Sequence, residues 1–337
     1  MMKMMLMGYT GRGFIAKSDS SMSGDGGSCQ IHLSSYSLSF STNVMKSEGS
    51  NRIYRTDGTG FHKFSLNAVR DCPTYNISMS IEARHDIMDF LLASMVKAGF
   101  HDAYTVTFQD ANSGVIYKFE HCYVTDMQLQ VSNNSAASIS LTFCHFDSTF
   151  EVKNGQYNLE PWCNGSGMAG ESIMPYYSFK VDYTGFPSTN LQEFSFSFSH
   201  TASPKYGCTG SLSLIALAPM ACVFSVPTVT YNLKYVMYDE LSSYDYDIAS
   251  NSIISCKSKY NKKKSMKISY KKINNKPYVR DNYYFLLNCD LCYPDTYTPE
   301  VGVSGSVNSI SIAGTVYGQL TYESETPEGY RDPLKDN

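Results

Sequence analysis

Residues 31–41 read IHLSSYSLSFS, and this stretch decides the fold. From Tyr36 to Ser41, each apolar residue is followed by a serine. A period of two places Tyr36, Leu38 and Phe40 on one face of a β-strand and the serines on the other. Residues 75–81 (YNISMSI) and 193–199 (EFSFSFS) show the same alternation. The sequence therefore predicts a mainly β protein.

The composition agrees with a sheet-rich fold. Of 337 residues, 42% are hydrophobic and 14% aromatic, but only 17% are charged. Aromatic and β-branched residues suit pleated sheets, and this charge content is below that of an average globular protein. The length is sufficient for two domains. The net charge of −4 excludes a protein that coats nucleic acid or an anionic membrane with its whole surface.

One helix is predicted, over residues 86–98. Its apolar stripe has the spacing i, i+3, i+4 and i+8 and consists of Ile87, Phe90, Leu91 and Met95. Asp86 can cap the first turn, and Gly99 suits the position after the last turn. Turn residues at 110–114 and 132–135 predict two hairpins that close the first domain near residue 150.

Three stretches recur in the same order later in the chain. Residues 193–201 echo 35–43 at an offset of 158, 230–236 echo 74–80 at 156, and 306–312 echo 135–141 at 171. This order indicates an internal duplication. We expect a flexible N-terminal arm (1–28), a first tube-like β domain (29–150), a linker (151–175), a second tube-like β domain (176–323) and a C-terminal tail (324–337).

A lysine-rich insertion is predicted at residues 257–276, which hold nine lysines. Within it, Met266, Ile268 and Tyr270 alternate with Lys267, Ser269 and Lys271, as in a strand with one face to bury. It is either a solvated hairpin or a cationic finger that faces an acidic neighbour or a nucleic acid. We expect it on an inter-subunit or outer face. The candidate inter-subunit residues are Lys262, Lys263, Lys264, Lys267, Lys271 and Lys272.

The sequence carries no GxSxG, HExxH, P-loop or strand–GxGxxG–helix motif, so we predict no enzyme and no cofactor. His121-Cys122 and Cys144-His145 become neighbours if their strands pair, but a Cys–His nucleophile also needs an orienting group and a cleft. Cys289 and Cys292 form a CxxC pair whose thiols would point to opposite faces of an extended strand. We therefore expect no metal site and mostly buried cysteines.

The first half has an order of elements that can be compared with known folds. An alternating strand in residues 71–86 (DCPTYNISMSIEARHD) leads into the helix, and a hairpin follows, formed by residues 122–131 and 137–143. This order resembles the tube-forming domain of bacteriophage tails, a family that includes type VI secretion tubes and the hub and initiator proteins of contractile tails. The resemblance covers residues 30–147 and, more faintly, 176–322.

The resemblance implies a structural virion protein, namely a tail-tube, tube-initiator or baseplate-hub subunit with tandem domains. Family rings carry six such domains, which implies a homotrimer with pseudo-sixfold symmetry. Its partners would be copies of itself, other tail or baseplate proteins, and DNA that passes through the lumen without sequence-specific binding. The opening residues 1–8 hold too short an apolar run for a signal peptide, so we expect assembly in the host cytoplasm and residence in the virion tail.

Two other function classes remain open at this point. The first is a tail-tip or receptor-binding β-sandwich module, which exposed tyrosines such as Tyr244 and Tyr246 would favour. The second is an enzyme, favoured only if Cys144, His145 and an acid converge in a pocket.

Overall fold

The computed structural model describes the chain in segments. These are residues 11–17, 28–41, 44–47, 50–54, 60–64, 67–70, 74–84, 87–88, 90–92, 96, 101–110, 113–146, 150–153, 174–186, 188–205, 221–236, 264–271, 284–300 and 309–325. Strands dominate them, so the prediction of a mainly β fold is confirmed. Two 3₁₀ turns occur in the second half: η2 (Tyr176–Ser178) directly precedes β12 (Phe179–Tyr183), and η3 (Ser188–Asn190) lies between β12 and β13 (Leu191–Ser199).

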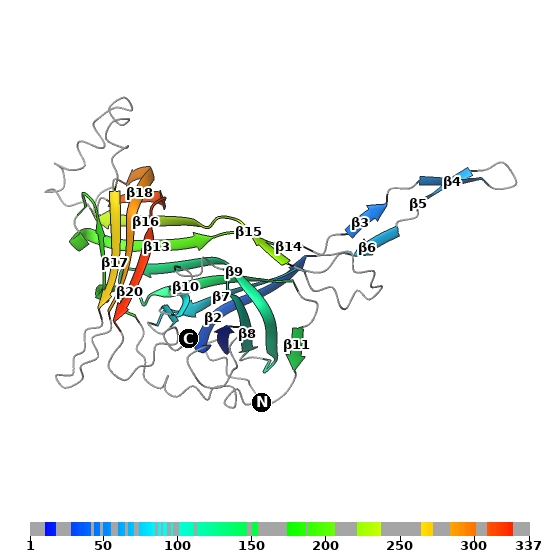
Figure 1. Cartoon of the computed structure of the whole chain (residues 1–337), viewed down its shortest axis with the longest axis horizontal. Coiled ribbons are helices and arrows are strands. Elements are labelled where there is room, and N and C mark those ends of the chain that lie inside the picture. The colour runs from blue at the N-terminus through cyan, green and yellow to red at the C-terminus, as the bar shows by residue number, and fades with distance from the viewer. Residues whose placement is uncertain are drawn as a thin grey trace, which may run out of the picture.

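Six antiparallel strands of the first half close into a barrel (Figure 1). Around the barrel they follow the order β1–β2–β7–β10–β9–β8 and return to β1. Their bounds are β1 (Gly11–Lys17), β2 (Ser28–Ser41), β7 (Thr74–Glu82), β8 (Ala103–Asp110), β9 (Ile116–Ser132) and β10 (Ser138–His145). A short strand, β11 (Phe150–Lys153), pairs with the start of β9. Closure covers both edges of β2 only over residues 28–33, where β1 pairs with it; residues 35–41 extend beyond β1.

The predicted helix and hairpins of the first half lie where the sequence places them. Residues 87–88, 90–92 and 96 are helical, and Ile87, Phe90 and Leu91 are buried in the main core; Met95 lies outside the described residues. The turn after β8 is closed by the Gly114 amide, which donates to the Asp110 carbonyl at 2.8 Å.

The expectation of a flexible arm over residues 1–28 is wrong for residues 11–17. This segment is β1, which pairs with both β2 and β8, and Ile15 is fully buried. Two glycines let β1 lie close to β8, because a Cβ at Gly11 or Gly13 would collide with the carbonyl oxygen of Gln109 or Thr107. The sequence signal was weak because GRGFIAK is short and does not alternate.

The second half continues the same sheet. Strand β13 pairs with β9, and from there the order is β13–β16–β19–β18–β17–β12, with β20 on β18. The strands are β12 (Phe179–Tyr183), β13 (Leu191–Ser199), β16 (Thr228–Val236), β17 (Lys264–Lys271), β18 (Tyr284–Glu300), β19 (Ser309–Val316) and β20 (Leu320–Glu325).

Three short two-stranded ribbons complete the described strands. Strands β14 (Ala202–Lys205) and β15 (Ala221–Phe224) pair beside the second half. The other two ribbons lie between β2 and β7 in the sequence and extend one after the other away from the barrel (Figure 1). They are β3 (Val44–Ser47) with β6 (Asn67–Arg70), and β4 (Ser50–Tyr54) with β5 (Gly60–Phe64).

The pairing pattern of the second half matches that of the first. Strands β12, β13, β16, β17, β18, β19 and β20 take the places of β1, β2, β7, β8, β9, β10 and β11. Every pairing among the first set has its counterpart in the second except β1–β2. Strand β1 pairs with residues 28–33 of β2, and their counterparts, 186–191, lie before β13 except for Leu191.

The irregularities of the ladders match as well. An extra residue interrupts the pairing at Ser34 in β2 and at Gln192 in β13, and again at Thr125 in β9 and at Asp295 in β18. The bulges at Ser34 and Gln192 keep the offset of 158 that the repeated sequence stretches predict. In β7 and β16, Ile81 corresponds to Tyr235, which is two residues away from the match that the repeated stretches give.

Each half forms two layers around a shared apolar core. One layer contains β2, β7, β10 and the end of β9, followed by β13, β16, β19 and the end of β18. In the second half, β12 of the other layer reaches across the core: the Phe179 and Phe194 rings lie 5.5 Å apart, and the Tyr183 and Tyr231 hydroxyls are hydrogen-bonded at 3.0 Å. The second half therefore curls around its core although its ring of strands stays open.

The predicted linker and tail are shorter than expected. Residues 151–153 belong to β11, and residues 324–325 belong to β20. Met174 donates its amide to the Ala83 carbonyl at 3.2 Å and accepts from the Ala137 amide at 2.9 Å. Residues 154–173 and 326–337 lie outside the described residues.

Candidate assembly surfaces

A continuous polar surface covers the outer side of the first layer across both halves. Directly opposite residues in antiparallel strands point to the same face, and on this face they are mainly serine, threonine, asparagine and glutamine. We call this surface the polar face. Its members include Ser35, Ser37, Ser39, Asn76, Ser78, Ser80, Ser140, Thr142, Gln128, Gln130, Ser195, Ser197, Thr230, Asn232, Ser311, Thr315, Thr296 and Thr298.

The polar face carries few charges relative to its hydroxyl and amide groups. Its charged members include Glu82, Asp126, Glu193 and Lys234. Carboxylates outnumber the ammonium group among these four. Burial raises the pKa of Asp126 above its usual value, so this carboxylate takes up a proton at a higher pH than a free aspartate does. The face therefore offers little attraction to a polyanion.

The two halves meet in a regular antiparallel ladder between β9 and β13. Seven residue pairs form it, from Glu193 opposite Ser132 to Ser199 opposite Asp126. On its inner side, Phe194, Phe196 and Phe198 are 3%, 2% and 2% exposed. They lie opposite Val131, Leu129 and Met127, which are buried as well. This junction has the hydrogen bonding and apolar burial of a strand pair within a single sheet.

A shallow polar groove of about 240 Å³ lies on the polar face at this junction. Strands β9, β13, β16 and β19 contribute its lining, which includes Gln130, Ser132, Glu193, Ser195, Asn232 and Lys234. The face thus stays polar where the halves join.

Strand β2 has an open edge where its counterpart β13 is covered. Residues 35–41 pair with β7 on one side, and no strand in the described part of the chain pairs with their other side. Tyr36, Leu38 and Phe40 share the inner face, as predicted, but Leu38 is 38% and Phe40 71% exposed. The counterparts of these two residues are Phe196 and Phe198, both nearly fully buried.

Strand β18 has a second open edge, where its counterpart β9 is covered. Residues 296–300 pair with β19 on one side, and among the described strands none pairs with their other side. The corresponding part of β9 pairs with β10 and with β13. Over the ranges that the structure describes, each chain therefore presents one open edge on β2 and one on β18.

The predicted lysine-rich insertion is part of the sheet over the residues that the structure describes, 264–271. Residues 264–271 are strand β17, the counterpart of β8 and an integral part of the sheet. Met266, Ile268 and Tyr270 are each 1% exposed, so the predicted alternation is confirmed, whereas the interpretation as an insertion is wrong. Lys267 lies on the solvent side of this strand, and a sequence pattern alone does not distinguish an integral strand from an added one.

Structure is described for only some of the candidate lysines. Lys267 is exposed, and Lys264 is half-buried and donates from Nζ to the Thr184 carbonyl at 3.2 Å. Lys271 ends β17, while Lys262, Lys263 and Lys272 lie outside the described residues. Since its strand neighbours face the core, Lys267 projects from the layer opposite the polar face.

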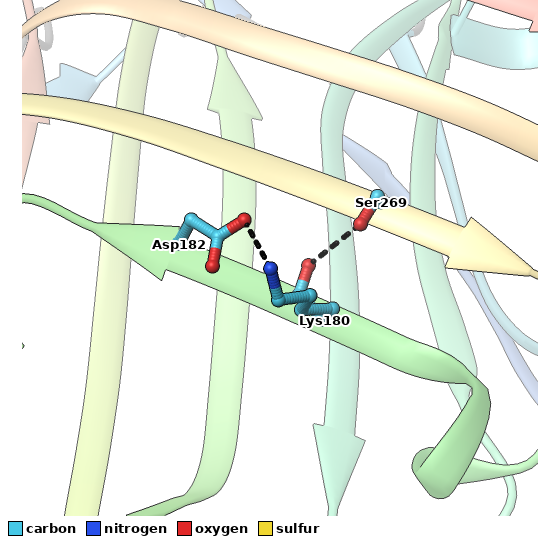
Figure 2. Close-up of polar contacts among 3 residues, drawn as sticks. All are labelled: Lys180, Asp182 and Ser269. Carbon is cyan, nitrogen blue, oxygen red and sulfur yellow. Dashed lines mark hydrogen bonds and ion pairs between the residues drawn. The ribbon is translucent and has the colours of Figure 1, made fainter. Parts of the chain in front are cut away.

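Acidic groups of the same chain lie beside this basic strand. Asp182 in β12 is directly opposite Lys267 in register, and its Oδ2 accepts from Lys180 Nζ at 2.9 Å (Figure 2). Ser269 Oγ donates to the Lys180 carbonyl at 3.3 Å and ties the two strands together. Exposed ion pairs of this kind stabilise a fold by less than about 1 kcal/mol.

The Cys–His neighbourhood considered above is a core contact. Cys122 Sγ lies 4.0 Å from His145 Nδ1, and both residues are fully buried. The His145 ring packs on Phe119 and Tyr75 at 5.4 and 5.8 Å between centroids. Burial raises the pKa of Cys122 well above its usual value, which opposes the thiolate form that a nucleophile requires.

The CxxC pair departs from the predicted geometry. Cys289 lies opposite Met266 and Cys292 opposite Lys264, so Asp290 and Leu291 form an irregular step that leaves both thiols buried. The prediction of opposite faces is wrong because it assumed a regular strand. The hydrogen bond that the Cys289 thiol donates to Cys292, together with burial, raises the pKa of Cys289. Neither cysteine forms a disulfide bond, and the same holds for the other four described ones, Cys29, Cys122, Cys144 and Cys222.

Within the described residues, no group of three or more His, Cys, Asp or Glu side chains is placed to hold a metal ion. No helix in that part of the chain is long and apolar enough to cross a membrane. A comparison with protein-family models gives no match, and a comparison with curated proteins gives none either.

Proposed function

We propose that this chain is a structural subunit of a phage-type tail tube, or of the initiator or hub at its end. In this proposal it consists of two tandem tube-like β domains, and three copies form a pseudo-sixfold ring around a channel for genome delivery. The observation that carries the proposal is the β9–β13 ladder, which joins two equivalent four-stranded units edge to edge.

The matched strand pairings support the tandem domains. Two unrelated sheets would not be expected to share their strand order and also the positions of their bulges at Ser34 and Gln192, and at Thr125 and Asp295. A duplicated unit that pairs with its own copy along an edge can pair with further copies in the same way. Repetition of the β9–β13 contact produces a continuous sheet that has no open edge once it closes.

The polar face supports a channel. A sheet closed around the ring axis would turn one face to the lumen, and hydroxyl and amide side chains keep such a face wet. Because the polar face carries few cations, it would release few counterions on contact with phosphates and would let DNA slide without sequence-specific binding. Lys267 would then project from the outer side of the ring, where neighbouring tail or baseplate proteins bind.

Negative-stain microscopy of the purified chain tests this function. We expect rings or stacked tubes with a constant central opening, as for a tail protein assembled in the host cytoplasm. A solution of monomers at high concentration would contradict the proposal. Compact trimers with side-by-side sandwiches and no opening would contradict it too, and would support a receptor-binding module of the tail tip instead.

A further inference from the structure

We infer that the open edge of β2, residues 35–41, binds the open edge of β18, residues 296–300, of a second copy of the chain in one defined register. This inference rests on the proposed function for the existence of a ring. It adds which strands meet and which residues lie opposite one another.

The two halves of the chain already show this contact. Strand β13 is the counterpart of β2, and β9 is the counterpart of β18, and β13 pairs with β9 over seven residues. The open edge of β2 thus corresponds to the edge of β13 that pairs with β9. The open edge of β18 corresponds to the edge of β9 that pairs with β13. A second copy supplies the missing partner for both.

The burial of the side chains shows that the β2 edge is incomplete. Phe198 is 2% exposed at the junction, whereas Phe40, the same residue type at the equivalent position, is 71% exposed. Leu38 is 38% exposed against 2% for its counterpart Phe196. Apolar side chains exposed along an unpaired strand are a template for another strand.

The register follows from the β9–β13 ladder. There Phe198 is opposite Met127, and the bulges at Gln192 and Asp295 fix how each residue corresponds to one in the other half. Transferred to β2 and β18, this register places Phe40 opposite Tyr297, with Ser39 opposite Thr298 on the polar face. The same register places Pro299 opposite Leu38. Proline has no backbone N–H, so Pro299 donates no hydrogen bond to β19 or to β2.

The two open edges differ from each other, so the contact is heterologous. Each chain offers β2 to one neighbour and β18 to the next, which gives head-to-tail addition. Such an interface forms a closed ring where the rotation closes and a helical filament where it does not. A symmetric pair of β2 edges would instead give only dimers.

Disulfide trapping tests the register. Ser39 and Thr298 are both exposed in the isolated chain, and residues directly opposite in adjacent strands have the Cα separation that a disulfide needs. Under mild oxidation of the full chain, the double variant Ser39→Cys/Thr298→Cys is expected to give a ladder of covalent oligomers on a non-reducing gel. We expect at least a tenfold higher yield than for either single variant or the unsubstituted chain.

The matched control is Ser39→Cys/Thr296→Cys, which shifts the pair by two residues and separates the thiols. Equal yields from both double variants, or no intermolecular bond in either, would overturn the inference. Rings seen by microscopy together with a failed cross-link would refute the β2–β18 contact and leave the ring function standing. A specific cross-link in open filaments without rings would support the contact and refute the ring.

Discussion

Two phenylalanines at equivalent positions allow the edge-pairing account to be tested by stability measurements. Phe198 in β13 is 2% exposed and Phe40 in β2 is 71% exposed. A buried phenylalanine removes roughly 200 Å² from water, so Phe40 buries about 140 Å² less than Phe198 does. At about 25 cal/mol per Å², this difference corresponds to about 3.5 kcal/mol.

The expected effects of alanine at the two positions differ accordingly. Phe198→Ala is expected to lower the free energy of unfolding by about 3–5 kcal/mol, because it leaves a cavity against Met127 and Phe196. Phe40→Ala is expected to lower it by less than about 1 kcal/mol in the dissociated chain. The same Phe40→Ala variant is expected to raise the concentration needed for assembly, because Phe40 is buried only there.

Urea unfolding followed by circular dichroism measures the first effect, at a protein concentration where sedimentation shows a single chain. Sedimentation over a concentration series measures the second. Equal losses of stability for Phe198→Ala and Phe40→Ala in the single chain would refute the assignment of the β2 edge as open. Unchanged assembly of the Phe40→Ala variant would refute its role in the contact between copies.

Three further predictions follow from burial and charge. Leu91→Asp is expected to destabilise the chain by several kcal/mol, because it places an unpaired carboxylate at a fully buried position. Ser35→Asp, on the exposed serine face, is expected to be tolerated. Similar urea midpoints for the two variants would contradict the assignment of the buried and exposed sides of the helix and the strand. In the native protein, Cys122 and Cys144 are expected to stay unreactive to a thiol reagent at pH 8. Burial raises the pKa of Cys144 to about 12 and the pKa of Cys122 well above its usual value. Rapid labelling of either cysteine, detected by peptide mapping, would contradict their buried state. Replacing Lys262, Lys263 and Lys264 with serine is expected to weaken the stacking of rings, most visibly at higher salt; normal stacking with a loss of DNA binding would show that these lysines face nucleic acid.

Alternation was a reliable guide wherever a strand is regular. The period of two in residues 193–199 and 266–270 predicts the inner faces of β13 and β17, and the apolar stripe of residues 87–91 predicts the buried side of the helix. These patterns report which side of an element is apolar, a property that the local sequence determines.

Features that depend on the partner strand could not be predicted in this way. β1 is short and lacks alternation, and it becomes a strand because β2 and β8 flank it and the glycines permit a close approach. The irregular step at Asp290 and Leu291 places both CxxC thiols in the core, although a regular strand would separate them.

The open edges were also hidden in the sequence. Phe40 and Phe198 occur in nearly identical serine-alternating stretches, yet only one of them has a neighbouring strand on both sides. No property of the residues themselves distinguishes the two environments. The difference arises because, among the described strands, β9 covers the edge of β13 and none covers residues 35–41 of β2.

Native mass spectrometry tests the central claim, a closed ring of tandem domains, most directly. The chain has a mass of 37.6 kDa, and we expect a dominant species of three chains that persists over a range of concentrations. Multiples of that species should appear as rings stack. A spectrum of monomers and dimers alone at high concentration, without any trimer, would contradict the claim.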